Sequence, residues 1–134
     1  MSRGLRNNNP GNIRRSSARY KGEVHPSRDE EFKEFQSMAY GYRAMFVLLD
    51  TYRTRYGLNT IRTILMRYAP PTESHTTSYI EFVVRHTGIG ADTPLNTRHM
   101  RDMIPIVAAM SEVENGVVAN ITEVEQGWRL FIEG

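Results

Sequence analysis

Cysteine is absent from the 134 residues of the sequence, which excludes disulfide bonds and thiol chemistry and leaves reducing and oxidising compartments equally open. No apolar run approaches the roughly 20 residues that a membrane-spanning helix needs. The polar beginning of the sequence also differs from a signal peptide. We therefore predict no membrane span and a protein made without a signal peptide.

The motifs of several enzyme classes are also missing. The sequence has no glycine-rich phosphate loop, no nucleophile elbow and no kinase signature. Its four histidines lack an HxxxH or comparable ligand spacing, and they are His25, His75, His86 and His99. We therefore predict neither a metal site nor a cofactor.

Lysine is scarce, because Lys21 and Lys33 are the only lysines among 17 basic residues. The remaining cations are arginines, which favour forked, planar contacts with carboxylates, phosphates or aromatic faces. Hydrophobic residues make up 40% of the chain and charged residues 24%, which is ordinary for a globular protein. Length and composition together predict a single domain over residues 1–134.

The chain divides into a polar beginning, a hairpin and a series of helices. Residues 1–19 show no apolar period, so they are expected to form an ordered loop or a flexible arm, the arm being expected over residues 1–6. Residues 20–36 alternate polar and apolar side chains around a turn-like segment, which predicts a two-stranded hairpin. The expected fold class is mainly α (α+β), with about five helices and one small β-hairpin.

Apolar residues at three- and four-residue steps, together with capping residues, place the helices. The predicted helices begin at Ser37, at Asn59 or Thr60, at Ser78, at Thr97 and at Asn120. Gly57, Pro70–Pro71 and Gly88 are expected to end the first three. Ser78 is chosen because it has capping-box spacing to Glu81, and Pro105 is expected to kink or break the fourth helix.

The segment RGLRNNNPGNIRR, residues 3–15, contains four asparagines and four arginines before any hydrophobic segment begins. Asparagine side chains donate and accept hydrogen bonds and tolerate left-handed backbone. An ordered loop of this kind either locks its own backbone or presents amides to a polar ligand such as a glycan. A single turn needs only one or two such residues, so the number of asparagines weakens the purely structural interpretation.

Carboxylates are concentrated in the hairpin, and a further one, Glu73, lies in the loop before the third helix. Glycoside cleavage needs a carboxylic acid that protonates the leaving oxygen and usually a second group that stabilises or attacks the cation-like sugar. A hairpin that faces a helix end could supply both groups. The alternative is that these carboxylates form the solvent-exposed face of the strands.

Three stretches in order, NNNPGNIRR followed by RYKGEV, then FKEFQSMAYGYRAMFVLLDTY, then RYAPPTESHTTSYIEFV, resemble small phage-encoded virion or lysis proteins that begin with a sequence like RGIRNNNPGNIR. More distantly, they resemble the later two-thirds of the lysozyme-like peptidoglycan glucosaminidases. In those enzymes an asparagine-rich turn precedes a W-x-G strand, an F-x-x-[YF] strand, a long helix and a Y-A-x-x-x-x-Y segment. The corresponding residues here are Asn8–Ile13, Tyr20–Gly22, Phe32–Phe35, the helix after Ser37, and Tyr68–Ala69 with Tyr79.

This resemblance implies a lysozyme-like domain that binds bacterial peptidoglycan, and it implies residue roles. In the glucosaminidases the general-acid glutamate ends a helix upstream of the asparagine turn, whereas this chain has no glutamate before Glu23. Either another carboxylate substitutes for it or the domain binds glycan without turnover. The expected catalytic residues are Glu73, Glu31 and Tyr68, and the expected substrate-binding residues are Asn8, Asn9, Asn12 and Tyr79.

Two other functions remain open from the sequence. A non-catalytic virion structural or cell-wall-binding protein would use the same groove and would have other virion proteins as partners. A small arginine-rich nucleic-acid-binding protein is disfavoured, because no recognition helix or interleaved aromatic residues accompany the arginines. The expected location is the phage virion or the host cell wall and periplasm.

Overall fold

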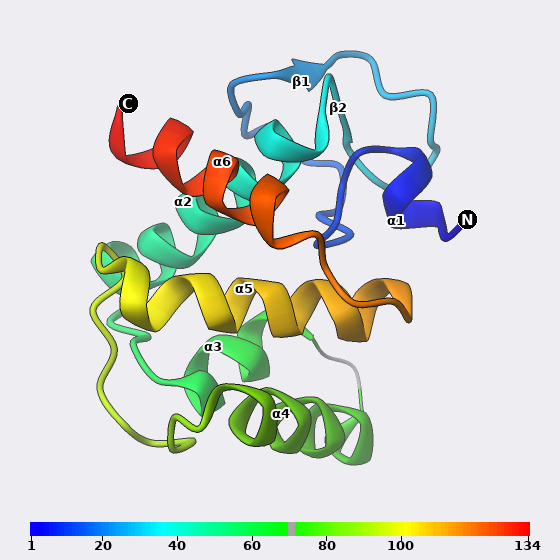
Figure 1. The fold of residues 1–134 in the computed structure, drawn as a ribbon. Helices are drawn as coiled ribbons and strands as arrows, with labels where there is room; N and C mark the ends of the chain where they lie inside the picture. The colour runs from blue at the N-terminus through cyan, green and yellow to red at the C-terminus, as the bar shows by residue number, and fades with distance from the viewer. Residues whose placement is uncertain (70–71) are drawn as a thin grey trace.

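The computed structural model describes residues 1–69 and 72–134, which are mainly helical with a two-stranded antiparallel sheet (Figure 1). The helices are α1 (Arg3–Arg6), α2 (Met38–Tyr56), α3 (Ile61–Tyr68), α4 (Glu73–Thr87), α5 (Met100–Asn115) and α6 (Ile121–Ile132). The strands are β1 (Glu23–Val24) and β2 (Glu34–Phe35), and Glu23 lies opposite Phe35. The predicted fold class is confirmed, with six helices in the described residues where about five were expected.

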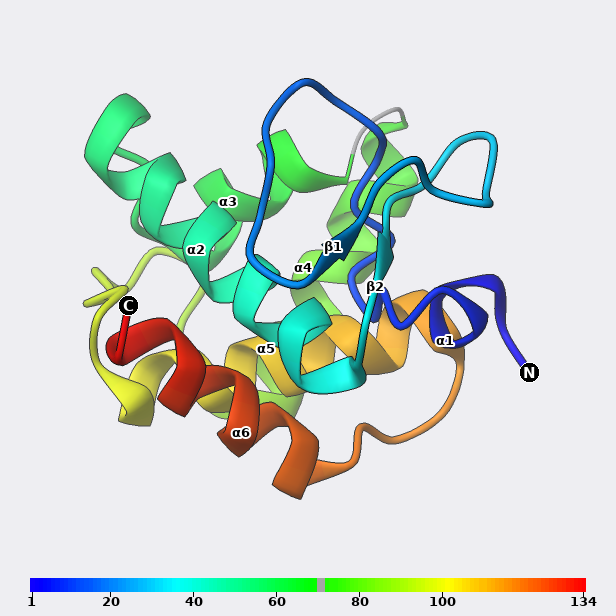
Figure 2. The same cartoon turned by 90° about the horizontal axis from the view of Figure 1, so that it is seen from above.

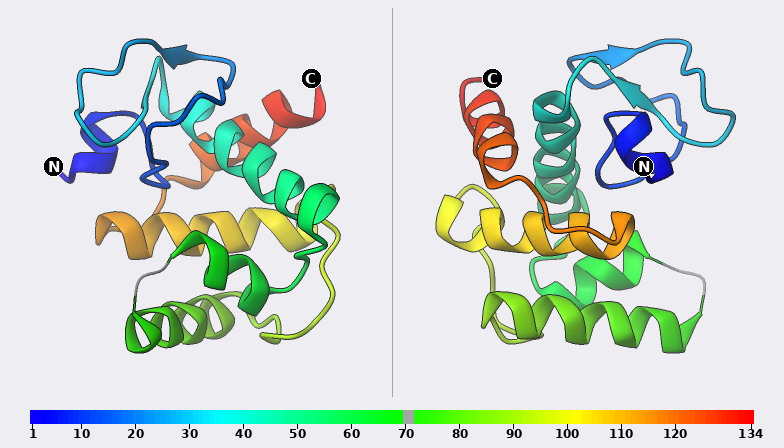
Figure 3. Two further views of the ribbon diagram at one scale, coloured as in Figure 1. Left: turned by 180° about the vertical axis from the view of Figure 1, so that it is seen from behind. Right: turned by 45° about the vertical axis from the view of Figure 1, so that its right-hand side comes forward.

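Helix α5 crosses the middle of the molecule. The views in Figures 1 and 3 place α2 and α6 on one side of it and α3 and α4 on the other. The N-terminal segment and the hairpin lie on the same side as α2, and α1 lies beside the C-terminal end of α5 (Figure 2). The N-terminal segment therefore meets residues 102 to 113 positions later in the sequence at the last turn of α5.

The core is built around the contact between α2 and α6. Trp128 of α6 packs edge-on against Phe46 of α2, with ring centroids 5.0 Å apart. The two helices approach closely at Gly127, where an added Cβ atom would lie 2.5 Å from the Cβ atom of Tyr42. The Tyr42 hydroxyl lies 2.8 Å from the hydroxyl of Ser111, so a buried hydrogen bond joins α2 to α5.

The small sheet is held by a buried ion pair as well as by its ladder. Lys33 Nζ donates to Glu23 Oε1 at 2.7 Å and to the backbone carbonyl of Ala18 at 2.7 Å. The Lys33 side chain is only 1% exposed and that of Glu23 only 5%. This pair fixes the loop of residues 15–19 to the hairpin, because a buried charge is stable only when it is paired and hydrogen-bonded.

Three predicted helix starts, those of α2, α3 and α6, are confirmed and two are wrong. Ser37 caps α2, and Thr60 caps α3 through a capping box with Thr63. Helix α4, however, begins at Glu73 with Thr72 as its N-cap, and Ser78 is an exposed residue inside it. The N-cap, Thr72, directly follows Pro71 in the sequence. The predicted end of α3 at Pro70 and Pro71 lies outside the described residues.

The start of α5 also differs from the prediction. The helix begins at Met100 with His99 as its N-cap, three residues after the predicted Thr97. Thr97 is buried and donates to Asp50 Oδ1 at 2.7 Å, which ties the preceding loop to α2. Pro105 lies within the continuous helix, so the predicted break does not occur.

The N-terminal segment is ordered, which settles the choice between an ordered loop and a flexible arm. Residues 3–6 form α1, whose N-cap Ser2 accepts from the backbone N–H of Leu5 at 3.2 Å. The Ser2 hydroxyl also donates to Asn115 Oδ1 at 2.7 Å. Sequence periodicity could not show this helix, because it has a single turn and is stabilised by contacts with α5.

Candidate functional site

The asparagine-rich turn, residues 7–13, is locked first by its own side chains. Asn9 is fully buried, and its Nδ2 donates to the carbonyls of Ile13 at 3.0 Å and Lys33 at 2.9 Å. Its Oδ1 accepts from the backbone N–H of Ile13 at 2.9 Å. Asn9 therefore holds the turn and joins it to the hairpin, because each of these bonds satisfies a buried backbone group.

Asn8 has a similar role. Its backbone adopts the left-handed conformation at φ 51°, which asparagine tolerates better than most residues. Its Nδ2 donates to the carbonyl of Phe35 at 3.1 Å. The predicted substrate-binding residues Asn8 and Asn9 thus use their amides inside the protein.

The C-terminal end of α5 packs against the same turn. Asn115 Nδ2 donates to the carbonyl of Pro10 at 2.8 Å. One residue earlier, Glu114 accepts from Asn12 Nδ2 through Oε1 at 3.0 Å and from the Tyr79 hydroxyl through Oε2 at 3.0 Å. Two distant parts of the chain, the asparagine turn and α4, therefore fix the carboxylate of Glu114 in place.

Glu114 occupies a position that helix stability alone does not favour. The last turn of a helix carries the negative end of the helix dipole, where a carboxylate is destabilising. The second amide atom of Asn12, Oδ1, is buried and has no hydrogen-bond partner among the described residues. Both features cost free energy of folding. Such unfavourable features are typical of functional sites, where the function requires a side chain at a given place.

A pocket of about 380 Å³ opens beside Glu114. Its described lining combines residues of the asparagine turn, the hairpin, α2, α3, α4 and α5, namely Gly11, Asn12, Ile13, Arg14, Phe32, Leu48, Tyr52, Arg67, Tyr68, Ala69, His75 and Glu114. Glu114 is the one carboxylate in this lining. The mixture of aromatic rings, an amide and charged groups is typical of a site for a polar ligand.

Tyr68 positions the turn at the edge of the pocket. Its hydroxyl donates to the carbonyl of Gly11 at 2.6 Å. Burial, and after it the negative charge of Glu114, raises the pKa of the Tyr68 hydroxyl well above its ordinary value. The same two causes, in the same order, raise the pKa of Tyr79. Both hydroxyls therefore stay protonated and act as hydrogen-bond donors.

The structure brings together only part of the predicted site. Asn12 and Tyr68 line the pocket, and Tyr79 reaches it through Glu114. Glu73 begins α4 and lines a separate groove between α3 and α4. The structure therefore separates Glu73 from Tyr68 and Asn12, with which the sequence grouped it.

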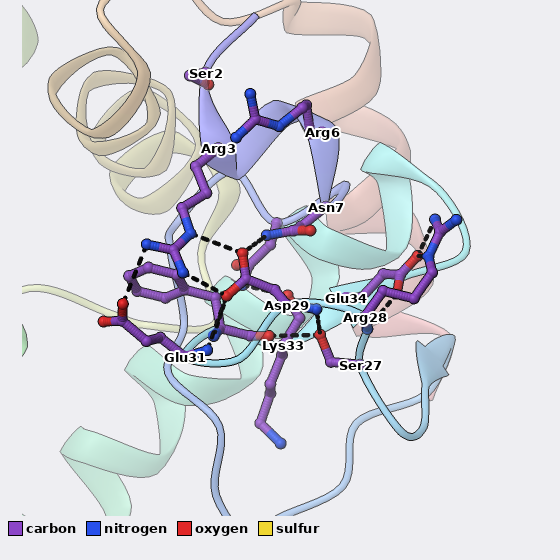
Figure 4. Close-up of polar contacts among 12 residues, drawn as sticks. Ser2, Arg3, Arg6, Asn7, Ser27, Arg28, Asp29, Glu31, Lys33 and Glu34 are labelled. Carbon is purple, nitrogen blue, oxygen red and sulfur yellow. Dashed lines mark hydrogen bonds and ion pairs between the residues drawn. The ribbon is translucent and has the colours of Figure 1, made fainter.

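Glu31 belongs to a cluster of ion pairs between α1 and the hairpin loop. Arg3 donates to Asp29 Oδ2 at 2.7 Å and to Glu31 Oε1 at 3.3 Å, and Asn7 donates to Asp29 Oδ2 at 2.9 Å (Figure 4). The Glu31 side chain is 54% exposed. This cluster fastens α1 to the hairpin loop and leaves Glu31 outside the pocket lining.

Sequence reasoning did not identify Glu114. The available signal was its place at the end of a helix that stops before Gly116, since the glucosaminidases carry their acid at a helix end. That helix was sought upstream of the asparagine turn, whereas α5 lies downstream in sequence and meets the turn only in the folded chain. Arg67 and His75 were missed as pocket residues for the same reason.

Two further features of the described residues bear on function. No helix among them is both long and apolar enough to cross a membrane. In residues 1–69 and 72–134, no three histidine, aspartate or glutamate side chains lie close enough together to hold a metal ion.

Fold and site together define a small, mainly helical protein with one fixed carboxylate beside a polar pocket. The chain belongs to the family of Protein P5 of Pseudoalteromonas phage PM2. The two are 41% identical over 119 residues, which cover 86% of this chain and 72% of Protein P5. No family model matches the chain. The relationship supports a phage origin.

Proposed function

We propose that the protein engages peptidoglycan and cleaves its glycan strand, with Glu114 as the acid–base carboxyl group. The observation that carries this proposal is the attachment of Glu114 to Asn12 and Tyr79 at the side of the pocket. Glycosidic cleavage needs a carboxyl group held next to the scissile oxygen in a fixed orientation. The two hydrogen bonds supply that orientation.

The resemblance to the lysozyme-like glucosaminidases supports the same role. In those enzymes the acid ends a helix that precedes the asparagine turn. Here α5 follows the asparagine turn in sequence, but the last turn of α5 lies against it. Asn115 of α5 donates to the carbonyl of Pro10, and Asn12 of the asparagine turn donates to Glu114 of α5. Under this proposal Glu114 takes the role that the upstream glutamate has in the glucosaminidases.

Each neighbouring residue has a part in the proposed reaction. Glu114 gives its proton to the leaving oxygen and takes one back from the group that attacks the sugar. Asn12 and Tyr79 keep the carboxyl group from rotating, and Tyr68 holds the backbone of Gly11 beside them. Tyr68 and Tyr79 therefore act as positioning residues.

The test is release of muropeptides from purified peptidoglycan sacculi, followed by turbidity and mass spectrometry. The wild-type protein is expected to release fragments, and Glu114→Gln is expected to reduce the rate by at least about a hundredfold, in the range typical of a lost acid–base group. Glu31→Gln and Glu73→Gln are the matched controls, since each removes a carboxylate outside the pocket lining.

Glutamine preserves the shape of the glutamate side chain, so each variant is expected to fold. Circular dichroism of each variant checks this expectation. Equal activity of Glu114→Gln and the wild type would remove Glu114 from the proposal. Loss of activity in Glu73→Gln or Glu31→Gln instead would restore one of those carboxylates as the acid.

We also propose that the protein acts from the phage particle, where it would meet the host cell wall. The relationship to a phage protein supports this location. Sedimentation of the protein with sacculi without fragment release would favour the alternative of a binding or structural virion protein.

A further inference from the structure

A second pocket, of about 260 Å³, lies between the loop of residues 15–19 and the hairpin, and we call it the hairpin pocket. Its described lining consists of Arg15, Ser16, Arg19, Glu23, His25, Ser27 and Lys33. None of these residues lines the pocket beside Glu114. Arg14 lines that pocket and Arg15 the hairpin pocket, as expected for an extended segment, in which successive side chains point to opposite sides.

The most buried part of the hairpin pocket is an ion pair. Lys33 Nζ donates to Glu23 Oε1 at 2.7 Å, and the backbone N–H of Tyr20 donates to Glu23 Oε2 at 3.1 Å. The Lys33 side chain is 1% exposed and that of Glu23 5%. The one carboxylate in the described lining therefore has both oxygens bonded inside the protein, and Lys33 already neutralises it.

Arg19 adds a second positive charge at the same place. Its Nη1 donates to the backbone carbonyls of Ser16 at 2.6 Å and Ala18 at 3.2 Å. Lys33 Nζ donates to the same two carbonyls, at 3.3 Å and 2.7 Å. Like charges that converge on shared acceptors repel each other, and Glu23, 3.9 Å from Arg19 Nη1, can neutralise only one of them.

Arg15 and His25 extend this cluster at the surface. Arg15 Nη1 donates to the backbone carbonyl of Asp29 at 3.2 Å, a contact that fixes the side chain without cancelling its charge. Arg19 Nη2 lies 3.1 Å from His25 Nε2. Because a guanidinium only donates, Nε2 accepts, and the neutral imidazole carries its proton on Nδ1. The described lining thus combines three cationic side chains with one carboxylate that is already paired.

An excess of positive charge around a confined pocket suits an anion with several acceptor oxygens. A terminal phosphate group has three strong acceptor oxygens and a charge of about −1.5 to −2 at neutral pH. A carboxylate has two oxygens in one plane and a single charge. Donors on Arg15, Arg19 and His25, which come from the loop and from the hairpin, match the phosphate better.

We propose that the hairpin pocket binds a terminal phosphate group. Arg19 and Arg15 are its cationic contacts, and His25 is a further donor. Lys33 contributes indirectly, because it cancels the charge of Glu23 that would otherwise repel the ligand. The site is separate from the proposed glycan cleavage, since the two pockets have no described residue in common. A soluble phosphomonoester and a lipid headgroup present the same phosphate chemistry.

The experiment is calorimetric titration of the wild-type protein at low ionic strength with methyl phosphate, dimethyl phosphate and acetate. Methyl phosphate is expected to bind at least about tenfold more tightly than the other two, because each of them has fewer free oxygens and less charge. Salt should weaken its binding. Sedimentation with vesicles of equal parts phosphatidylcholine and phosphatidic acid tests a lipid source of the phosphate.

Arg19→Gln is expected to lower the affinity for methyl phosphate at least about tenfold, the size of a lost charge-assisted hydrogen bond. Arg129→Gln is the matched control, because Arg129 is an exposed arginine of α6 outside the hairpin pocket. Melting temperatures show whether each variant is folded. Arg15→Gln, which removes a single carbonyl contact, provides the same test if the loop does not tolerate Arg19→Gln.

Three results overturn the proposal: methyl phosphate does not bind, acetate binds equally well, or neither Arg19→Gln nor Arg15→Gln lowers the affinity. Arg19-dependent binding of a short DNA duplex without binding of methyl phosphate also overturns it, since it indicates an extended nucleic-acid surface. Binding of methyl phosphate supports the proposal, and binding of the vesicles as well names a lipid headgroup as the source. None of these measurements uses muropeptide release, so the two proposals fail separately.

Discussion

At the scale of single residues, the asparagines of the N-terminal turn have different roles. Asn7 and Asn9 bind groups of the hairpin region, and Asn8 occupies a left-handed backbone position and bonds to β2. Only Asn12 combines a left-handed backbone, at φ 49°, with a place in the pocket. Most of the amides are therefore needed to build the turn, and one of them is available to the site.

Asp29 gives a prediction about acid stability. Arg3, followed by Asn7 and the backbone N–H of Glu31, holds the pKa of Asp29 far below its ordinary value. A carboxylate with a lowered pKa in the folded state stabilises the protein above its unfolded pKa, and this contribution is lost as the pH falls through the folded pKa. The pKa of Glu34 is lowered in the same direction by Arg28.

We expect the free energy of unfolding to decrease steadily as the pH falls below about 4, the ordinary range of an aspartate. Urea unfolding at a series of pH values measures this decrease. Asp29→Asn removes the titrating group, so its stability should depend less steeply on acid than that of the wild type. Parallel curves for the two proteins would show that the Arg3–Asp29 contact does not control acid stability.

At the scale of elements, caps and helix ends follow local chemistry wherever the neighbouring chain allows it. Ser37 and Gly57 bound α2 as the sequence predicts, because a serine N-cap and a left-handed glycine satisfy helix-end groups without tertiary help. Helix α4 starts one and a half turns before the predicted Ser78, because Thr72 offers a cap of the same chemical type earlier in the chain.

The start of α4 can be tested by a pair of substitutions. Thr72→Ala removes the side chain that accepts from the His75 backbone N–H, so it should lower the free energy of unfolding by about 1 kcal/mol. Ser78→Ala changes an exposed position inside the helix and should have an effect within about 0.5 kcal/mol. Chemical denaturation compares the two. The opposite order would place the N-cap at Ser78.

At the scale of the whole molecule, the N-terminal segment packs against α5. The N-terminal segment contacts its last turn through Ser2, Pro10 and Asn12, and α6 packs on α2 close by. The proposed site consequently requires residues separated by about a hundred positions in sequence, as shown by the Asn12–Glu114 separation of 102. Loss of the N-terminal contacts would release Glu114.

This arrangement predicts one cooperative unfolding transition for residues 1–134. Trp128, the single tryptophan, is buried between α6 and α2 and reports on that contact, whereas far-ultraviolet circular dichroism reports on all helices. Fluorescence and circular dichroism should give the same urea midpoint, as they do for a two-state domain. Two separated midpoints would show that the helices on the two sides of α5 unfold independently.

The predictable part of the fold and site consists of features with local causes. The hairpin region, α2, α3 and α6 follow from alternation, periodicity and caps over a few residues. Asn12 and Tyr68 could be predicted as site residues because they occupy motif positions in the resemblance to the glucosaminidases. Glu114 was not found, since nothing in the residues around it indicates that the asparagine turn, 102 positions away, will bind it.

The sequence by itself determined the mainly helical class and the small hairpin, because these depend on interactions between neighbouring residues. Tertiary structure alone decided that α1 forms, that Thr97 anchors a loop to Asp50, and which carboxylate faces the pocket. The physical reason is that burial and long-range hydrogen bonds select among local alternatives of similar free energy, and those contacts exist only in the folded chain.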